Sequence, residues 1–530
     1  MFDILTFDGP AQSIENTVML TELPLPLLPP LVALLLLAYT RSAGWSLFIG
    51  SLTGVLLIGN GPFYSAPLHW FTDHFLPAIV KLSHWSAILF TLLLAAFAAV
   101  IERSGALAKL LQAWSQKGNQ AATSRLQLSV VALGFLCFFD GLANALMLGR
   151  VSRTLADQAS VSREKLAYLV DTTSSAVACV AFLSTWTITQ LTYISQNLAE
   201  SAYQTPSYLL FLQSIPYNFY CLGSLFLVVL SAYWNWNPST MAKAKPRPLP
   251  LEKNPAVAID KGSRRAAFGP IAILLASVPF SFWVIGGNKP FPTSVEDIQR
   301  AFSSNLGPYA LLLAGTISVF GAVLFFPGKK KNAWKSIPSG MSSLGPALIV
   351  LLMAWVLGST LTELETGTYL ASLLGEQFSI HFLPLITFIL GCLIAFSTGT
   401  SWGTMGLLMP LALSTFLSTV TEQGLSPEET AFLLPPLIAA VFGGAVFGDH
   451  ASPFSDTTIV SALACDISTT AHVMTQLPYA LLAASAAIFF GYIPLGLGLP
   501  SILTIPLPLA FILFFIILRR KKDTSLTKSH

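Results

Sequence analysis

Stretches of about twenty apolar residues recur along almost the whole chain, and they limit its fold more than any other feature. An α-helix of that length crosses a hydrocarbon core about 30 Å thick. Charged residues make up only 10% of the chain, whereas they are roughly 25% of a soluble domain. The alternating segments of about ten residues that build a transmembrane β-barrel do not occur in the sequence. The sequence therefore predicts an all-α polytopic membrane protein with about 11–13 transmembrane segments.

The connections between the apolar spans differ in their content of Lys and Arg. Basic residues are concentrated in the connections 103–125, 150–165, 235–266 and 329–335 and in the tail 519–530. The only Lys or Arg residues in the connections 60–83, 195–207, 288–307, 363–381 and 420–430 are Lys81, Lys289 and Arg300. Because cytoplasmic loops carry the excess of Lys and Arg, we expect the basic connections to be cytoplasmic. The predicted spans lie near 24–40, 45–59, 84–101, 126–149, 166–194, 208–234, 267–287, 308–326, 344–362, 382–419, 431–466, 475–493 and 500–518.

Two of these spans are flanked by connections of one kind. Residues 126–149 have basic connections on both sides, and residues 382–419 have acidic ones. A segment that enters and leaves on the same side is a re-entrant hairpin, which is tolerated where protein or a water-filled cavity surrounds its turn. We therefore expect one hairpin open to the cytoplasm and one open to the outside, with two ordinary spans as the alternative.

The two halves of the chain carry a weak internal repeat. A shift of 264 residues places "VSREKLAYLV" on "LSPEETAFLL", and it places "STW" at 184–186 opposite "GDH" at 448–450. Each half contains a hairpin, a polar turn with S-x-E, and then a long interrupted span. Because the hairpins are expected to open to opposite sides, the repeats are predicted to be inverted, as in many secondary transporters.

This repeat divides the chain into two membrane halves. The predicted parts are an N-terminal half 1–234 with its repeat core at 126–194, a basic cytoplasmic linker 235–266, a C-terminal half 267–518 with its repeat core at 382–466, and a basic cytoplasmic tail 519–530.

The stretch "FGDHASPFSDTT" gathers more polar chemistry than any other part of the apolar chain, and it lies in the middle of 431–466. That segment is far longer than one span requires. Pro453 has no backbone N–H to donate, so we expect two half-helices that meet at this sequence. Unwound backbone at membrane depth is a common binding site for ions in transporters.

Candidate binding residues come from this break, from "LSTWT" in the first half and from the hairpin tips "FFDGLAN" and "FSTGTSWGTMG". A hydroxyl in a membrane helix often bonds only a carbonyl of its own helix. A central Asp costs about 2.5–3.5 kcal/mol even on the lowest scale, which makes the aspartates stronger candidates. In the second half the candidates are Asp449, His450, Ser452, Ser455, Asp456, Thr457, Thr458, Ser397, Thr398, Thr400 and Ser401. In the first half they are Asp140, Asn144, Asp171, Ser184 and Thr185.

These oxygen-bearing side chains suit a small, hard cation, because they can replace its hydration shell. We expect Na⁺ at Asp449 and Asp456, with Asp140 and Asp171 as second choices. His450 can ligate, carry a proton, orient Asp449 or simply pack. The sequence shows no paired Cys or His spacing for a transition metal, no phosphate loop and no nucleophile with a base. We therefore expect no cofactor and no enzymatic activity.

These motifs resemble the NhaC-type sodium/proton antiporter family of the ion transporter superfamily. In the second half the resemblance is carried by "GTSWGTMGLLMP", "FGDHASPFSDTT" and "DISTTAHVMTQLPYAL", and in the first half by "SREKLAYLVDTTSSAVA" and "STW". It covers residues 125–195 and 385–490 well and the outer spans loosely. One position departs from the family's pattern, because Gly141 stands in "FFDGLAN" where the pattern has a second acid. That departure leaves stoichiometry and substrate open.

The resemblance implies exchange of cytoplasmic Na⁺ for external H⁺ by alternating access, with carboxylates that hold a cation or a proton in turn. Similar transporters of malate and lactate make a Na⁺- or H⁺-coupled exchanger of small carboxylates or amino acids the leading alternative. A passive channel fits poorly, since one chain with inverted repeats has no evident pore axis. The expected location is a bacterial plasma (inner) membrane, with the N-terminus outside and the C-terminus cytoplasmic. The expected partners are lipid, Na⁺ and H⁺, with no nucleic acid; a homodimer is left open.

Overall fold

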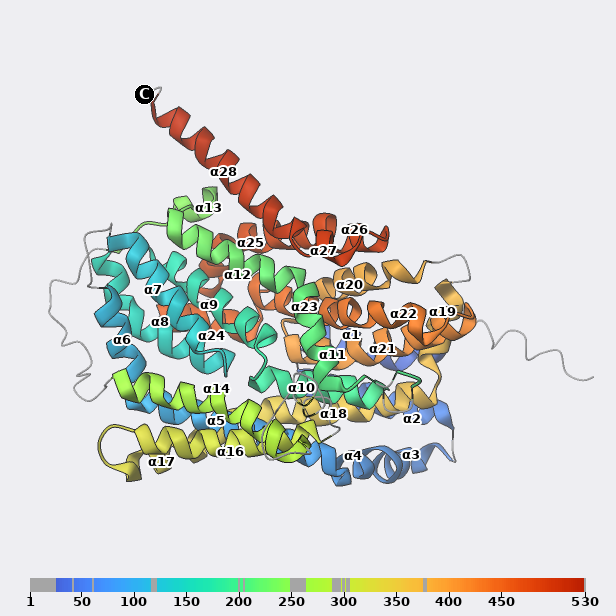
Figure 1. The fold of residues 1–530 in the computed structure, drawn as a ribbon. Coiled ribbons are helices and arrows are strands. Elements are labelled where there is room, and N and C mark those ends of the chain that lie inside the picture. Colours follow the sequence, from blue (N-terminus) through green and yellow to red (C-terminus); the bar gives the residue numbers. More distant parts are fainter. Residues whose placement is uncertain are drawn as a thin grey trace, which may run out of the picture.

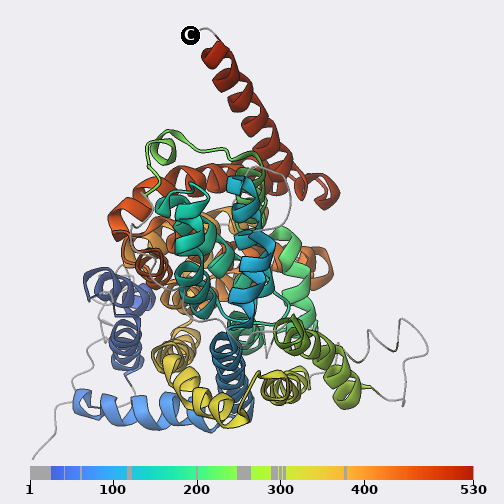
Figure 2. The same ribbon diagram turned by 90° about the vertical axis from the view of Figure 1, so that its left-hand side faces the viewer.

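In a computed structural model, the described residues are 25–528 except 41, 60–61, 116–121, 199–200, 204, 248–263, 288–296, 298–300, 302–305 and 375–378. Every regular element among them is a helix, so the all-α prediction is confirmed. Most helices run along one common direction (Figure 1), and a quarter turn shows many of them end on (Figure 2). Nine helices in the described ranges are long and apolar enough to cross a membrane, or ten if one bent pair counts as a span. The chain is a multi-pass membrane protein.

Several predicted spans differ in length from the observed helices. The segments predicted at 24–40 and 45–59 form α1 (Leu28–Thr40) and α2 (Ala43–Ile58), which are shorter than a full span. The span predicted at 208–234 is divided between α11 (Ser207–Ser214) and α12 (Phe219–Trp234), with Pro216 in the turn between them. Apolar composition alone does not locate such interruptions.

The remaining helices complete the bundle. They are α3 (Ala66–His69), η4 (Trp70–Phe75), α4 (Leu76–Val80), α5 (Leu82–Ser104), α6 (Ala106–Ser115), α13 (Ser239–Ala242), α14 (Arg264–Gly286), α16 (Gly307–Phe325), α17 (Lys330–Ser343), α18 (Gly345–Glu363), α19 (Thr366–Leu374), α22 (Pro427–Thr430), η7 (Ala431–Leu433), α25 (Thr469–Ala486), α26 (Ile493–Gly496), α27 (Ser501–Thr504) and α28 (Leu507–Lys528).

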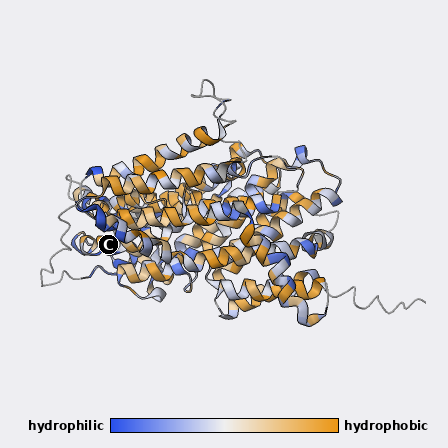
Figure 3. Ribbon diagram, turned by 90° about the horizontal axis from the view of Figure 1, so that it is seen from below, coloured by the Kyte–Doolittle hydropathy of each residue, from blue (hydrophilic) through white to orange (hydrophobic). Residues whose placement is uncertain are grey.

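The surface of the bundle is apolar over most of its length. Hydrophobic residues cover most of the ribbon in Figure 3, and the end of α28 is hydrophilic. Large apolar side chains such as Ile502 and Phe514 are exposed. Exposed apolar side chains along helices of this length are suited to lipid tails rather than water.

Each half contains a pair of helices joined by a short turn at the place where a hairpin was predicted. The first consists of α7 (Ala122–Leu136) and α8 (Gly141–Gln158), and the second of α20 (Leu383–Thr398) and α21 (Ser401–Glu422). The side chain of Asp140 caps α8 by accepting from the Ala143 N–H at 2.8 Å. The side chain of Thr400 likewise caps α21 by accepting from the Gly403 N–H at 3.1 Å. Both turns are therefore stabilised by capping side chains.

Each half also contains an interrupted helix. In the first half α9 (Arg163–Val180) and α10 (Thr185–Leu198) are bent by 40° at their junction. In the second half α23 (Leu434–Ala451) ends before Pro453 and α24 (Asp456–Cys465) follows it. The break predicted from "GDHASPFSD" is confirmed.

The pairing of the two breaks by a shift of 264 residues is wrong. Eighteen residues separate the cap Ser162 from the end of α9, whereas twenty-five separate the cap Ser426 from the end of α23. The extra residues form α22 and η7, about two helical turns. The break that follows Val180 therefore corresponds to 452–455, and Ser184, just before α10, takes the position of Ser455, not of Gly448.

The tip of each hairpin packs on the break of its own half. In the first half the Thr185 N–H donates to the Phe139 carbonyl at 3.0 Å. In the second half Gly399 has a φ of +71°, and a Cβ there would lie 2.7 Å from the backbone carbon of Phe454. Only glycine combines this left-handed backbone with so close a contact.

Small residues bring α20 and α23 into close contact. Gly444 and Gly448 lie four residues apart on α23 and face Gly391 and Ala395 of α20. A Cβ on Gly448 would lie 2.3 Å from the Cβ of Ala395, and one on Gly444 would lie 2.9 Å from the Cα of Gly391. This spacing of small residues lets membrane helices approach closely. The contact holds the second hairpin beside the second break.

Basic and acidic connections lie at different ends of the bundle. In Figure 1, α6 and the lysine-bearing α17 are at the left end, and α19 and the acidic α22 are at the right. The described start of the linker also reaches the membrane part, because Arg247 Nη1 lies 2.6 Å from Asp466 Oδ2 and its Nη2 donates to the Asp466 carbonyl at 2.6 Å. This pair lies just beyond the end of α24.

The Arg247–Asp466 pair is expected to release the linker in acid. The hydrogen bond from Arg247 lowers the pKa of Asp466 below its ordinary value of 3.8. Since the folded-state pKa is depressed, the stabilisation is present above the unfolded value and is lost as pH falls through the folded one. The effect is small because the Asp466 side chain is 57% exposed. A nitroxide label on Lys245→Cys should become more mobile in electron paramagnetic resonance as the pH falls below the folded-state pKa of Asp466. In the double variant with Asp466→Asn, the label should be mobile already at neutral pH. A spectrum unchanged by Asp466→Asn would show that the pair with Arg247 does not hold the linker.

Candidate functional site

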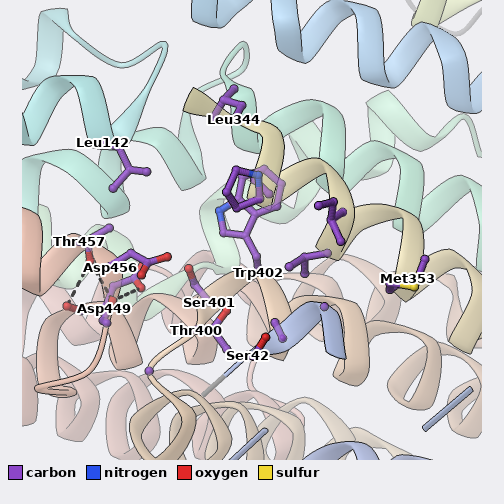
Figure 4. Close-up of a pocket in the computed structure, with 18 of the residues that line it drawn as sticks. Ser42, Leu142, Leu344, Met353, Thr400, Ser401, Trp402, Asp449, Asp456 and Thr457 are labelled. Carbon is purple, nitrogen blue, oxygen red and sulfur yellow. Dashed lines mark hydrogen bonds between the residues drawn. The ribbon is translucent and has the colours of Figure 1, made fainter. Parts of the chain in front are cut away.

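A cavity of about 760 Å³ lies where the two hairpin tips and the two breaks meet. The first half contributes Asp140 and Thr185, and the second half contributes Thr400, Ser401 and the end of α23 with the start of α24. Figure 4 shows Asp449, Asp456 and Thr457 on one side of the cavity and Trp402 and Met353 on the other. Of the predicted site residues, those that line it are Asp140, Thr185, Thr400, Ser401, Asp449, Ser455, Asp456 and Thr457.

Four helices begin at this cavity. The first residues of α8, α10, α21 and α24, or the residues that cap them, are all among its lining. A helix N-terminus carries a partial positive charge of about half an elementary charge from its free N–H groups. These N-termini stabilise ionised carboxylates at the cavity without a basic side chain.

Asp449 is the most constrained carboxylate of the lining. It is 1% exposed, and its Oδ1 accepts from the Ser455 hydroxyl at 2.8 Å. Its carbonyl accepts from the Thr458 hydroxyl at 2.5 Å, which joins α23 to α24 across the break. Among the described residues, its Oδ2 has no hydrogen-bond partner. A buried carboxylate oxygen without a partner is costly, and a cation or proton would satisfy it.

Asp140 and Asp456 complete the acidic wall. Asp140 is 5% exposed and caps α8, whereas Asp456 is exposed at the first turn of α24. No Lys, Arg or His occurs in the described lining. No group of three His, Cys, Asp or Glu side chains that could hold a metal occurs in the described ranges either. A small cation would thus be held by one or two carboxylates together with hydroxyl and carbonyl oxygens.

Gly141, the position at which the resemblance led us to expect a second acid, lies beside Asp140 in the lining. A Cβ on Gly141 would lie 3.3 Å from the Ser174 carbonyl oxygen of α9. A side chain there would require this carbonyl to move by a few tenths of an ångström, so the glycine allows the first hairpin to pack closely on α9.

Aromatic residues form the wall opposite the acids. The rings of Trp186 and Trp402, one from each half, lie 6.1 Å apart at 63°. Trp45 and Phe48 of α2 and Trp70 of η4 also line the cavity. The sequence did not indicate these three residues, because an aromatic residue in so apolar a chain gives no local signal that it lines a binding site.

Eight predicted site residues lie outside the lining. Ser397 and Thr398 donate to the Ile394 carbonyl of their own helix. Ser184 donates to the Ala178 carbonyl at 2.6 Å and accepts from the N–H of Thr187, so it caps α10. The others are Asn144, which donates to the carbonyls of Gly134 and Thr173, and Ser452, Thr458, His450 and Asp171.

His450 and Asp171 belong to a buried layer behind the break. His450 hydrogen-bonds through Nδ1 with the Tyr220 hydroxyl at 2.8 Å and through Nε2 with the Ser175 hydroxyl at 3.1 Å. Asp171 accepts from Ser461 and Gln476 and lies beside His472. The sequence did not indicate that His472 and Gln476 lie beside Asp171. Their spacing of four residues in one helix was the only signal available.

Comparison with known proteins agrees with this architecture. A model described as the Na⁺/H⁺ antiporter family matches residues 177–497. An uncharacterized protein of Haemophilus influenzae is 30% identical over 494 residues, 89% of this chain and 90% of that protein. The malate-2H⁺/Na⁺-lactate antiporter of Bacillus subtilis is 30% identical over 151 residues, which is 28% of this chain and 29% of that protein.

The fold is also similar to that of a solved transporter. MtrF of Neisseria gonorrhoeae, described as illuminating a class of antimetabolite efflux pumps, has a TM-score of 0.54 over 87% of this chain and 93% of its own, at 14% identity. The family match covers more than half of the chain, and its members are antiporters rather than enzymes. The chain belongs to the Na⁺/H⁺ antiporter family.

Proposed function

We propose that this protein exchanges cytoplasmic Na⁺ for external H⁺. The observation that carries the proposal is the cavity at the meeting point of both hairpin tips and both breaks, with three carboxylates and no described basic residue. Desolvation favours the neutral form of a carboxylic acid, whereas a bound cation favours the ionised form. A cation and a proton therefore compete for this wall.

Asp449 is the proposed centre of the Na⁺ site. Its free Oδ2, with Asp456 and the hydroxyls of Ser455 and Thr457, supplies oxygens of the kind that a small hard cation prefers. Asp140 and Thr400 approach from the two hairpin tips. Movement of the hairpins relative to the breaks would open the cavity to one side and then to the other, as expected for inverted repeats.

The proposed location is a bacterial plasma membrane with the basic end of the bundle in the cytoplasm. The distribution of Lys and Arg between the two ends supports this orientation. A membrane-impermeant thiol reagent added to intact cells tests this orientation on the single-cysteine variants Ser426→Cys and Lys335→Cys. Only the cysteine at position 426 should react.

The test of function uses the purified protein in proteoliposomes with an imposed pH gradient. Addition of Na⁺ alone should collapse the gradient, and liposomes without protein should keep it. A requirement for an organic acid would contradict plain Na⁺/H⁺ exchange. Parallel additions of Li⁺ and K⁺ define the ion selectivity.

A second candidate is the coupled exchange of a small carboxylate. The cavity volume of about 760 Å³ favours it, because this volume lies within the range of organic-ligand sites and exceeds what one ion needs. Helix N-termini can also bind a carboxylate group. The partial similarity to a malate/lactate antiporter is a further support.

Radiolabelled malate or lactate distinguishes the two candidates. Uptake that depends on a Na⁺ or H⁺ gradient would support the second candidate. The acidic lining favours the opposite result, with no uptake and Na⁺/H⁺ exchange unaffected by either acid.

A further inference from the structure

A second polar centre is buried away from the cavity, around Asp171 of α9. The Asp171 side chain is 0% exposed, and it does not line the cavity. Its Oδ1 accepts from the Ser461 hydroxyl of α24 at 3.0 Å, and its Oδ2 accepts from the Gln476 amide of α25 at 2.6 Å. Two neutral donors thus hold a carboxylate in the interior.

His472 lies next to this carboxylate and is equally buried. Its Nε2 is 3.5 Å from Asp171 Oδ2, and the side chain is 0% exposed. Within the part of the chain that the structure describes, neither ring nitrogen of His472 has a hydrogen-bond partner. An imidazole buried without partners is unusual, because such groups are normally satisfied. A proton on Nε2 would allow it to donate to the carboxylate.

We propose that Asp171 and His472 form a proton-binding site that is separate from the cation cavity and coupled to it through α24. The proposal rests on the Na⁺/H⁺ exchange proposed above, and it assigns the exchanged proton to this pair instead of the cavity carboxylates. The incoming proton bonds to the free lone pair of His472, and no other bond forms or breaks. The pair changes from net negative to net neutral, which burial favours.

Other titratable groups act on this pair. They are His450 and Asp449 on α23, Tyr220 on α12 and Cys465 on α24. The negative charge of Asp449 strengthens the attraction of the pair for a proton. A cation at Asp449 cancels that charge and weakens the attraction, so Na⁺ binding expels the proton. This sign of coupling is the one that exchange requires.

The helix α24 connects the two sites physically. Its first turn carries Asp456 and Thr457, which line the cavity, and Ser461, one turn later, donates to Asp171. The helix has only ten residues and is separated from α23 by the break. A change of charge at Asp171 and His472 therefore acts on a short helix whose start belongs to the cation site.

The experiment measures proton release on Na⁺ addition to the detergent-solubilised protein, with a pH-sensitive dye, and Na⁺ binding with ²²Na⁺. We expect His472→Gln to keep its Na⁺ affinity within about threefold while proton release per bound Na⁺ falls at least about fivefold. The matched control is His84→Gln, since His84 is also a buried histidine but contacts the Ala78 carbonyl. Release at the wild-type level from His472→Gln would overturn the proposal and place the proton on the cavity carboxylates.

Two further variants keep the proposal testable if His472→Gln does not fold. Asp171→Asn keeps the shape of the side chain and should lose proton release in the same way. Ser461→Ala leaves both titratable groups in place and should lower proton release per bound Na⁺. Normal proton release from Asp171→Asn or from Ser461→Ala would contradict the proposal. Failure of the proposed exchange is distinguishable, because then the wild-type protein would bind no Na⁺.

Discussion

Replacement of Asp449 by asparagine is expected to abolish Na⁺-driven proton movement in proteoliposomes while the protein still folds. Asparagine has nearly the same size, and its oxygen can still accept from Ser455, so the junction of α23 and α24 is retained. It lacks the charge that attracts the cation. If the lost attraction is comparable in strength to a hydrogen bond to a charged group, about 1.5–3 kcal/mol, Na⁺ affinity should fall by about tenfold to a hundredfold.

The control for this experiment is Asp73→Asn. Asp73 is a half-exposed carboxylate on η4 that contacts His69 and does not line the cavity. Its replacement should leave exchange unchanged. Wild-type flux in Asp449→Asn would show that the cation binds elsewhere.

Replacement of Gly448 by alanine is expected to destabilise the packing of α23 against α20. The new methyl group would lie 2.3 Å from the Cβ of Ala395 and 2.6 Å from its backbone carbon, so α20 and α23 must move apart. Overpacking of this kind usually costs about 1–3 kcal/mol, and the backbone contact places this variant at the upper end. The thermal unfolding midpoint of the purified protein in detergent should fall.

Gly345→Ala is the matched control, because a Cβ at Gly345 on α18 meets no atom within 4 Å. Its unfolding midpoint should stay near that of the wild type. Equal midpoints for the two alanine variants would mean that the contact between α20 and α23 is not tight.

Local chemistry explains what could be predicted from the sequence. Pro453 and the charged residues around it indicate a broken helix by themselves, and the structure confirms the break. The hairpins were expected from the charges of their flanking connections, and helix pairs with turns occur at both places. In each case the signal lies within a few residues of the feature.

Contacts between distant helices could not be predicted in this way. Asp171 and Gln476 are separated by 305 residues, and helices that are apolar on all sides give no periodicity to show which faces meet. The fixed shift between the repeats failed because the second half has two extra turns before its break. Trp70 was not predicted in the cavity wall either, because nothing in the sequence shows that its segment lies beside the hairpin tips and the breaks.

The convergence of four helix N-termini has a consequence for the number of ions carried. Four N-termini contribute on the order of two positive charges, whereas Asp140, Asp449 and Asp456 contribute three negative ones when ionised. The empty cavity then has a net charge of about −1, which a single monovalent cation neutralises. A loaded cavity would move across the membrane field without carrying charge, so the loaded step of the transport cycle should be insensitive to membrane voltage.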